Sequence, residues 1–242
     1  MRRNNEQRRD YSQIDFFNVM NLARYEEYGV KNPHMDTDEI VWRVNNNLDK
    51  EKYAYDVLIE DCHSLYVIVN KYFKLPEDFC PKDLVEADGI LMRRDTALAY
   101  AQMRDAAKAA GFSISVVNAY RSCKEQKELY DHFLLTDTAA VVDTSCARPG
   151  YSEHHTGLAI DIEGSIPGGR NIHMTPEAAW VKENCHKYGF ILRYLPETEE
   201  ITGYISEPWH LRYVGKEVSN DMQQRNIKTL EEYTERFLKS YN

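Results

Sequence analysis

Apolar and polar residues repeat with helical or strand-like spacing through the middle of this chain. The Ala-rich run 95–110 has helical spacing, Asp95 or Thr96 is placed to cap it, and Gly111 follows its end. Residues 112–120, FSISVVNAY, are a nearly continuous apolar run that predicts a buried strand. The pattern therefore predicts a helix that leads directly into a strand.

The same mixture continues toward the C-terminus. Pro176 suits the first turn of a helix and Gly189 suits its end. The elements predicted beyond residue 120 are helices at 123–135, 176–189, 216–226 and 229–241, and strands at 158–164, 190–194 and 211–215. Strands and helices alternate without a clear βαβ repeat. We therefore predict an α+β fold with a small, mainly antiparallel sheet flanked by helices.

The first 50 residues have a different character. They are polar and charged around one amphipathic stretch, residues 16–29, which predicts a peripheral helix. Residues 65–76, LYVIVNKYFKLP, predict a strand or short helix at the entrance to the next region. We therefore divide the chain into an N-terminal helical or connector region, 1–55, and a larger domain with C-terminal helices, 56–242.

Length and charge narrow the choice of partners. The 242 residues fit one large domain, or one domain with an appended region. The formal net charge of -9 argues against non-specific nucleic-acid binding, which depends on clustered positive charge. No stretch approaches the ~20 apolar residues of a membrane span, and no apolar run follows the basic N-terminus as in a signal peptide. We expect no nucleic-acid partner and no membrane span in this chain, and the oligomeric state stays open.

Cysteine usage leaves two alternatives. The five cysteines form no C-x-x-C pair, which argues against a cysteine zinc site, and their odd number argues against a complete disulfide framework. One bridge, between Cys123 and Cys146, is one alternative. Five free and mostly buried thiols are the other.

Two segments combine imidazoles with carboxylates, SEHHTGLAID at 152–161 and EPWH at 207–210. A catalytic zinc needs three protein ligands and one open position for water. His154 precedes a glycine that permits a sharp turn, and Asp161 lies on the strand that follows. The third ligand must come from elsewhere, and His210 is the best candidate. We therefore predict one zinc ion per chain, held at loop–strand junctions.

Glu207 stands three residues before His210, with Pro208 stiffening the turn between them. This spacing can aim a carboxylate at metal-bound water without making it a ligand. Zinc lowers the pKa of such water to roughly 7, and a carboxylate can then take its proton during attack. Glu207 alone could be a solvated loop acid and Asp161 alone a strand-end turn residue. The combination of the two segments makes the catalytic interpretation the stronger one.

Both segments closely resemble the signature segments of VanY-type D-alanyl-D-alanine carboxypeptidases, which are zinc peptidases of bacterial cell walls. The first segment matches every fixed position of the family pattern Ser-x-His-x-x-Gly-x-Ala-x-Asp, at Ser152, His154, Gly157, Ala159 and Asp161. The second matches Glu-x-x-His through Glu207 and His210. NAYRSCKEQKELY and ENCHKYGFILRY are also similar to family segments, so the resemblance covers roughly residues 60–215.

The resemblance implies roles for the matching residues. Glu207 is implied to be the general base and afterwards the acid that protonates the leaving amine. Arg121 is implied to stabilise the substrate carbonyl as it becomes an oxyanion, which suits a fixed guanidinium. Ser152 and Gln126 are implied to bind the terminal carboxylate of the substrate. The implied zinc ligands are the three residues proposed above.

One departure from the family lies just before Arg121. The family usually has Ser-Gly before the Tyr-Arg-Ser run, while this chain has Asn118 and Ala119. Loss of the glycine is expected to alter the local backbone or narrow the approach to the site. The departure bears on specificity and leaves the metal ligands unaffected.

We expect a zinc-dependent carboxypeptidase that removes the C-terminal D-amino acid, D-Ala, from peptidoglycan stem peptides or their precursors by attack of zinc-bound water. An L,D-carboxypeptidase or an endopeptidase on the same stem peptides is an alternative. A non-catalytic, zinc-containing wall-binding module is another, although it has no need of the base Glu207. A cell-wall substrate places the protein outside the cytoplasm, with any export or anchor segment absent from this chain; a cytoplasmic protein is the alternative.

Overall fold

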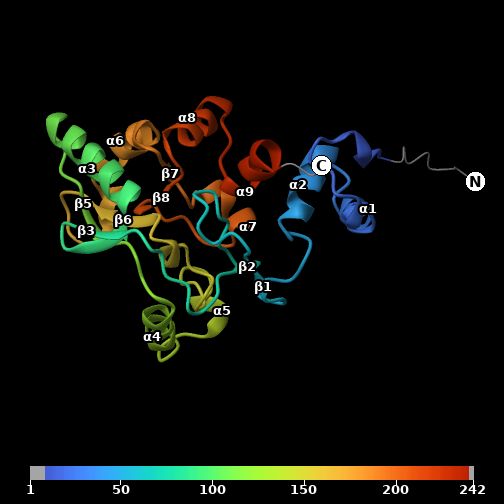
Figure 1. Cartoon of the computed structure of the whole chain (residues 1–242), viewed down its shortest axis with the longest axis horizontal. Coiled ribbons are helices and arrows are strands. Elements are labelled where there is room, and N and C mark those ends of the chain that lie inside the picture. The colour runs from blue at the N-terminus through green and yellow to red at the C-terminus, as the bar shows by residue number, and fades with distance from the viewer. Residues whose placement is uncertain (1–8, 240–242) are drawn as a thin grey trace, which may run out of the picture. The chain divides into compact units, whose positions relative to one another are not determined.

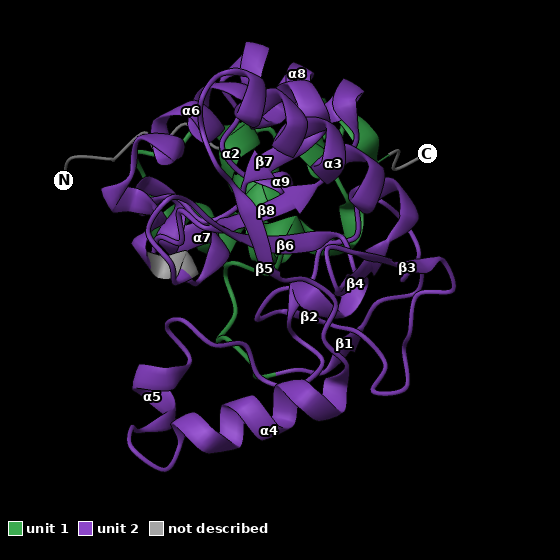
Figure 2. Ribbon diagram, turned by 90° about the vertical axis from the view of Figure 1, so that its left-hand side faces the viewer, with its two compact units in different colours: residues 1–54, 231–242 green, residues 55–230 purple. Residues whose placement is uncertain are grey.

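The structure is a computed structural model that describes residues 9–239, and Figure 1 labels its helices and strands. Contacts divide the chain into two units, one of residues 1–54 with 231–242 and one of residues 55–230 (Figure 2). Residues 1–8 of the predicted connector region lie outside the described part. None of the helices within residues 9–239 is both long and apolar enough to cross a membrane.

The smaller unit joins the two ends of the sequence. Its helices are α1 (Leu22–Lys31), α2 (Thr37–Asn45) and most of α9 (Leu230–Tyr233), which runs on into a π-helical turn, Thr234–Leu238. Asn46 Nδ2 donates to the carbonyl oxygen of Glu231 at 3.2 Å, and Arg236 Nη1 donates to Asp38 Oδ2 at 2.6 Å. Residues 231–239 therefore pack with the N-terminal region, although the division predicted from the sequence assigns them to the 56–242 domain.

The helix α2 was not predicted. Its buried residues Ile40, Val41, Trp42 and Val44 are nearly consecutive, so they give no clear helical period. Asp38 and Glu39 stand in its first turn, where negative charge is favourable. Tertiary burial against the C-terminal segment, more than local pattern, explains this helix.

The larger unit is built on a four-stranded sheet in the order β5-β6-β8-β7, with every neighbouring pair antiparallel. Its strands are β5 (Ser115–Asn118), β6 (Ala159–Glu163), β7 (Phe190–Leu192) and β8 (His210–Tyr213). Two smaller sheets pair β1 (Val57–Leu58) with β2 (Phe73–Lys74) and β3 (Leu84–Ala87) with β4 (Ile90–Arg93). The predicted α+β class with a small, mainly antiparallel sheet is confirmed.

Helices lie on both sides of this sheet (Figures 1 and 2). On one side lie α3 (Arg94–Ala109), α6 (Pro176–Asn184) and α8 (Lys216–Arg225), and on the other α4 (Cys123–Phe133) and α5 (Ala139–Val142); α7 (Glu199–Thr202) is a single short turn. Tyr100 and Met103 of α3 are fully buried in one core with Ile160, Ile162 and Leu211 of the sheet. Burial of these apolar side chains fixes which face of each strand points to the helices.

Several predicted boundaries shift. Helix α3 begins one residue earlier than predicted. Its N-cap is Arg93, not Asp95 or Thr96, and the Arg93 side chain makes no capping hydrogen bond. Residues 65–76 contain only the two-residue strand β2. All five cysteines are free, so the alternative bridge between Cys123 and Cys146 is not formed.

Replacing Gly157 with alanine is expected to lower the free energy of unfolding by about 3 kcal/mol. Gly157 has φ +64°, and an added Cβ would lie 3.2 Å from the backbone nitrogen of Arg93. Gly111→Ala is the matched control, because Gly111 has φ +86° but open space around it, and it should cost only about 1 kcal/mol. Chemical denaturation of both variants measures the difference, and equal losses would contradict the close-packing argument.

Candidate metal site and catalytic cleft

His154 lies on a short 3₁₀ helix, Glu153–Thr156, that turns the chain into β6. Ser152 caps this helix, since its Oγ accepts a hydrogen bond from the His154 backbone nitrogen at 3.3 Å. Gly157 ends it in the left-handed conformation, which favours glycine. The sharp turn expected at Gly157 is confirmed, and it brings His154 back over the strand that carries Asp161.

Three strands place polar residues in one row on the face of the sheet away from α3. Asp161 of β6 stands directly opposite His210 of β8 and opposite Asn118 of β5. A register shift between Val116 and Asn118 adds one residue to β5 at Val117. Because such a bulge re-aims the side chains that follow it, Asn118 reaches the same face and donates to Asp161 Oδ2 at 2.8 Å.

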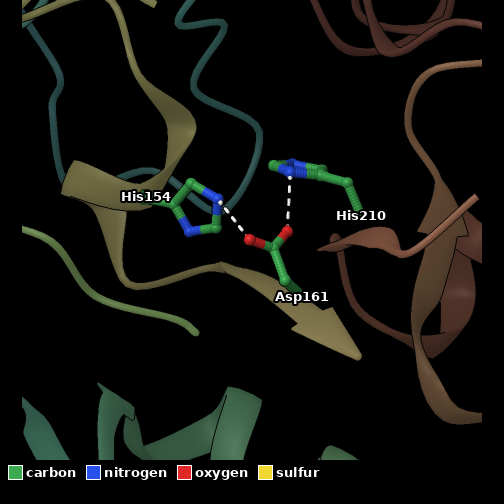
Figure 3. A group of neighbouring side chains, drawn as sticks. All are labelled: His154, Asp161 and His210. Atoms are coloured by element: carbon green, nitrogen blue, oxygen red, sulfur yellow. Dashed lines mark ion pairs between the residues drawn. The ribbon is translucent and has the colours of Figure 1, made fainter. Parts of the chain in front are cut away.

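The three predicted metal ligands lie together. His154 Nε2 is 3.3 Å from Asp161 Oδ2, and His210 Nδ1 is 3.2 Å from Asp161 Oδ1. Figure 3 shows the two imidazoles approaching different oxygens of the one carboxylate. One ligand atom from each residue lies within 4.8 Å of the others, and both histidines are buried. The sequence-predicted set is therefore brought together as a possible metal site.

The contacts of the imidazoles show which nitrogen each has available. His154 Nδ1 lies 2.7 Å from the carbonyl oxygen of Ala119, to which it can only donate. Its Nε2 is thereby left as the acceptor nitrogen, facing Asp161. His210 presents its Nδ1 to Asp161, while its Nε2 is directed at Glu153. Each imidazole thus directs one nitrogen to Asp161, and its other nitrogen contacts the Ala119 carbonyl or Glu153.

One oxygen of Asp161 has no hydrogen-bond partner, which favours a bound cation between the three predicted ligands. Asp161 Oδ1 is buried and accepts no hydrogen bond, although His210 Nδ1 is near it. A buried carboxylate oxygen without a partner is costly, and a metal ion is one way to satisfy it. Two histidines and one carboxylate are also the ligand set of a catalytic zinc with one open position.

The charges of the three residues are strongly coupled. Burial alone would raise the pKa of Asp161, but the neighbouring imidazoles hold it well below its usual value. Burial lowers the pKa of His154. Burial acts in the same direction on His210, yet its contacts with Asp161 and Glu153 raise its pKa to about 9. The metal-free site therefore keeps a carboxylate that is negative at neutral pH, as a metal ligand must be.

The site opens into a cleft of about 240 Å³ in the larger unit. The cleft is lined by Val117, Arg121, Gln126, Leu129, Phe133, Ser145, Cys146, Ala147, Ser152, Glu153, His154, Asp161, Tyr194, Tyr204, Glu207, Trp209 and His210. All seven residues singled out from the sequence as catalytic, substrate-binding or metal-binding are among them. The structure thus gathers the whole predicted site around one cavity.

Glu207 is held beside the three predicted ligands by its backbone. Its nitrogen donates to the carbonyl oxygen of Tyr194 at 3.0 Å, and its own carbonyl accepts from the nitrogen of His210 at 3.1 Å. Its Oε2 lies 3.7 Å from His210 Nδ1. This turn places the buried carboxylate of Glu207 beside the three predicted ligands, at a longer distance from His210 than the carboxylate of Asp161.

Arg121 is tied to the segment that carries His154. Its backbone nitrogen donates to the His154 carbonyl at 3.1 Å, and its carbonyl lies 2.6 Å from His155 Nδ1. Its Nη1 donates to Gln126 Oε1 at 2.7 Å, while Gln126 Nε2 donates to the Ala147 carbonyl at 2.8 Å. The guanidinium is therefore aimed at the cleft by a glutamine that is itself fixed.

His155 points away from the metal site. It accepts from the backbone nitrogen of Gly150 at Nε2 and donates from Nδ1 to Arg121, which satisfies a neutral imidazole completely. Burial lowers its pKa to about 4. His155 therefore links two loops of the site as an uncharged group.

Three further residues were missed in the sequence. Glu153 is completely buried, and its Oε1 accepts from Arg193 Nε and from Arg212 Nη1, both at 2.8 Å. Burial alone would raise the pKa of Glu153, but the two arginines hold it below its usual value. One signal was available, because Arg212 stands two residues after His210 and so shares its face of the strand.

Comparison with known proteins bears directly on this site. Residues 89–216 match the family described as VanY, D-alanyl-D-alanine carboxypeptidase. That match includes the predicted ligands, Glu207 and Arg121.

The chain belongs to the VanY family of D-alanyl-D-alanine carboxypeptidases.

Two relatives show how far the family similarity extends. YodJ of Bacillus subtilis (strain 168) is 38% identical over 194 residues, which are 75% of this chain and 71% of YodJ. A D-alanyl-D-alanine carboxypeptidase of Enterococcus faecium is 35% identical over 81% of this chain. The match spans 59% of the length of that enterococcal enzyme.

Solved structures of the VanY type share the fold. The LdcB LD-carboxypeptidase matches with a TM-score of 0.70 and 36% identity, over 77% of this chain and 92% of LdcB. A VanY D,D-pentapeptidase in complex with Zn(II) matches with a TM-score of 0.61 and 32% identity, over 69% and 97%. Carboxypeptidases described as D,D and as L,D therefore both resemble this chain.

The neutral state of His155 predicts a pH dependence of stability in the metal-free protein. Its folded pKa of about 4 lies below the usual value, so the unfolded chain binds the proton more readily. The contribution of His155 to the free energy of unfolding is complete above pH ~6.5. It falls by about 3 kcal/mol as the pH falls toward 4. Denaturant titrations from pH 4 to 7 should show that the free energy of unfolding rises less steeply with pH in His155→Gln than in the wild type. Parallel slopes would show that His155 does not titrate in this way.

Proposed function

We propose that this VanY-family protein is a zinc-dependent carboxypeptidase that removes the C-terminal D-Ala from peptidoglycan stem peptides. The observation that carries the proposal is the set of His154 Nε2, an Asp161 oxygen and His210 Nδ1 within one small buried centre, with Glu207 beside it. The family membership supports peptidase activity on D-Ala ends. Zinc itself is supported by the ligand set and by the Zn(II) complex of the related VanY structure.

One zinc ion per chain would be held by His154, Asp161 and His210. When bound, it would supply Lewis acidity, polarising the substrate carbonyl and making water a stronger nucleophile near neutral pH. Asn118 holds Asp161 Oδ2, and the Ala119 carbonyl holds His154, so two ligands are oriented by the bulged strand. The chain therefore presents a largely prearranged ligand set.

The chain's own residues supply the proton transfers and the charge stabilisation. Glu207 takes the proton of the attacking water and later returns it to the leaving amine. Arg121, fixed through Gln126, stabilises the negative charge that develops on the carbonyl oxygen. The hydroxyl of Ser152 lies in the same cleft and is proposed to bind the terminal carboxylate. The amide of Gln126, expected to share this role, is already engaged by Arg121 at Oε1 and by Ala147 at Nε2, so we assign it the positioning of Arg121 instead.

A substrate of this kind also suggests a location. Peptidoglycan stem peptides are exposed outside the cytoplasm, so we propose that the protein acts in the cell envelope or after secretion. The proposal rests on the substrate alone.

An L,D-carboxypeptidase is the second candidate. It is favoured by one observation: the match to the LdcB LD-carboxypeptidase has a higher TM-score and covers a larger share of this chain than the match to the VanY structure. Defined muropeptides ending in D-Ala-D-Ala, or in a single D-Ala after an L-centre, distinguish the two when products are identified by mass spectrometry. Release of D-Ala from the first substrate alone supports the D,D activity, and release from the second alone supports the L,D activity.

Replacing Glu207 with glutamine should lower kcat/KM for D-Ala release by roughly 10²–10⁴-fold, because the carboxylate is the only group assigned to move the proton. Zinc content, measured by elemental analysis, should stay at one ion per chain. Glu197→Gln is the matched control and should retain wild-type rates, because Glu197 is exposed on the 3₁₀ helix Pro196–Thr198. Full activity in the Glu207 variant would refute the assignment of the base.

Removal of the metal should abolish activity reversibly. Dialysis against a chelator is expected to reduce D-Ala release to background, and added zinc should restore it. His210→Ala should prevent restoration, because only two ligands remain. His186→Ala is a matched control outside the cleft and should be restored as the wild type is. Unchanged zinc content in the His210 variant would exclude this ligand assignment.

A further inference from the structure

A buried cluster of charges lies directly behind the predicted metal ligands. The side chains of Glu153, Arg193 and Arg212 are fully buried in the larger unit. Both arginines donate to the same oxygen, Glu153 Oε1, at 2.8 Å. Buried charges are expensive and give little net stability, so a cluster at this position needs a reason beyond folding.

The second oxygen of Glu153 faces a predicted ligand. Its Oε2 lies 3.4 Å from His210 Nε2, on the side of the ring opposite the metal site. A carboxylate oxygen only accepts hydrogen bonds, so the imidazole nitrogen beside it must carry the proton. The other ring nitrogen, Nδ1, faces Asp161 Oδ1 at 3.2 Å, so it is the nitrogen that would give up its proton to bind a metal beside Asp161.

We propose that Glu153 is a positioning residue that holds His210 with its proton on Nε2 and its Nδ1 free to bind the metal. The proposal rests on the proposed zinc site and adds the group that selects the ligand nitrogen. Glu153 neither touches substrate nor binds the metal in this scheme. It acts through His210.

The arginines make this acceptor rigid. Arg212 Nη2 also donates to the carbonyl oxygens of Leu65 at 3.0 Å and Val67 at 2.9 Å, so its guanidinium cannot follow a displaced carboxylate. Arg212 lies on β8 two residues after His210, on the same face of the strand. Ligand and anchor are thus mounted on one strand, and Glu153 bridges them.

The pattern of donors predicts what an amide at this position would do. Both arginines can only donate, and they converge on Oε1. In Glu153→Gln the single amide oxygen would therefore turn to the arginines, and the NH₂ group would face His210 Nε2. His210 would then have to accept at Nε2 and carry its proton on Nδ1, which blocks the nitrogen that faces the metal site.

The test measures zinc affinity, which does not depend on catalysis. Competition with a chelator of known affinity should show a zinc Kd about 10–100-fold higher for Glu153→Gln than for the wild type. Glu177→Gln is the matched control, since Glu177 is also buried but bonds to Ser113 and Ser165 away from the site. Its zinc Kd should match that of the wild type.

A second readout separates positioning from mere structure. Long-range ¹H–¹⁵N spectra of both zinc-free proteins, recorded at a pH high enough to leave His210 neutral, should show the proton on Nε2 in the wild type and on Nδ1 in Glu153→Gln. If the variant is too unstable, Glu153→Gln with Arg193→Met removes one of the two cations that lose their countercharge and keeps Arg212 to orient the amide. Thermal unfolding confirms that each variant is folded.

The outcomes are distinct. Zinc binding by the wild type with an equal Kd in the folded Glu153 variants overturns this proposal and leaves the proposed function intact. Absence of zinc binding by the wild type refutes the proposed function first. A weaker zinc Kd together with the proton on Nδ1 supports the positioning role.

Discussion

The register between β6 and β8 is the constraint on which this site depends. It sets Asp161 directly across from His210, and a slip of one residue would turn one of them into the apolar core. That core lies on the opposite face, where Ile160 and Leu211 pack against α3. The arrangement of the candidate ligands is therefore a consequence of hydrophobic burial, because the alternation that buries Ile160 and Leu211 on one face places Asp161 and His210 on the other.

The polar face is organised by backbone atoms as much as by side chains. His154, His155 and Arg121 are interlocked through main-chain carbonyls and nitrogens, and His154 is oriented by the carbonyl of Ala119. The departure from the family pattern falls at this place. Asn118 donates to Asp161 Oδ2 through its side-chain amide, and a serine, with a hydroxyl in place of the carboxamide, has a shorter side chain. His154 contacts the main-chain carbonyl of Ala119, which any residue at this position provides. Replacement of the family's glycine by alanine therefore leaves the contact with His154 available.

Much of the fold could be predicted from local pattern. The α+β class, the strands around Asp161 and His210, and helices α4 and α6 follow from apolar spacing and turn residues, which act over short distances. The bulge at Val117, the pairing of Asp161 with His210 and the helix α2 depend on tertiary packing, and no local signal encodes them. In the site, the residue types and their spacing predicted the three candidate ligands and Glu207, which the structure places together. Glu153 could not be predicted, because its burial depends on Arg193 and Arg212, which are 40 and 59 residues away in the sequence.

The joining of the sequence ends in the smaller unit has a consequence for biosynthesis. Residues 55–230 form one continuous stretch, so all of the larger unit has been synthesised before Glu231 is added. Helix α2, by contrast, contacts residues that lie far away in the sequence. The hydrogen bond from Asn46, at its C-cap, to Glu231 joins residues 185 positions apart. Closing so long a loop is slow and carries an entropic cost. The larger unit can thus fold during synthesis, before the N-terminal helices can form their contacts with Glu231 and the residues that follow it.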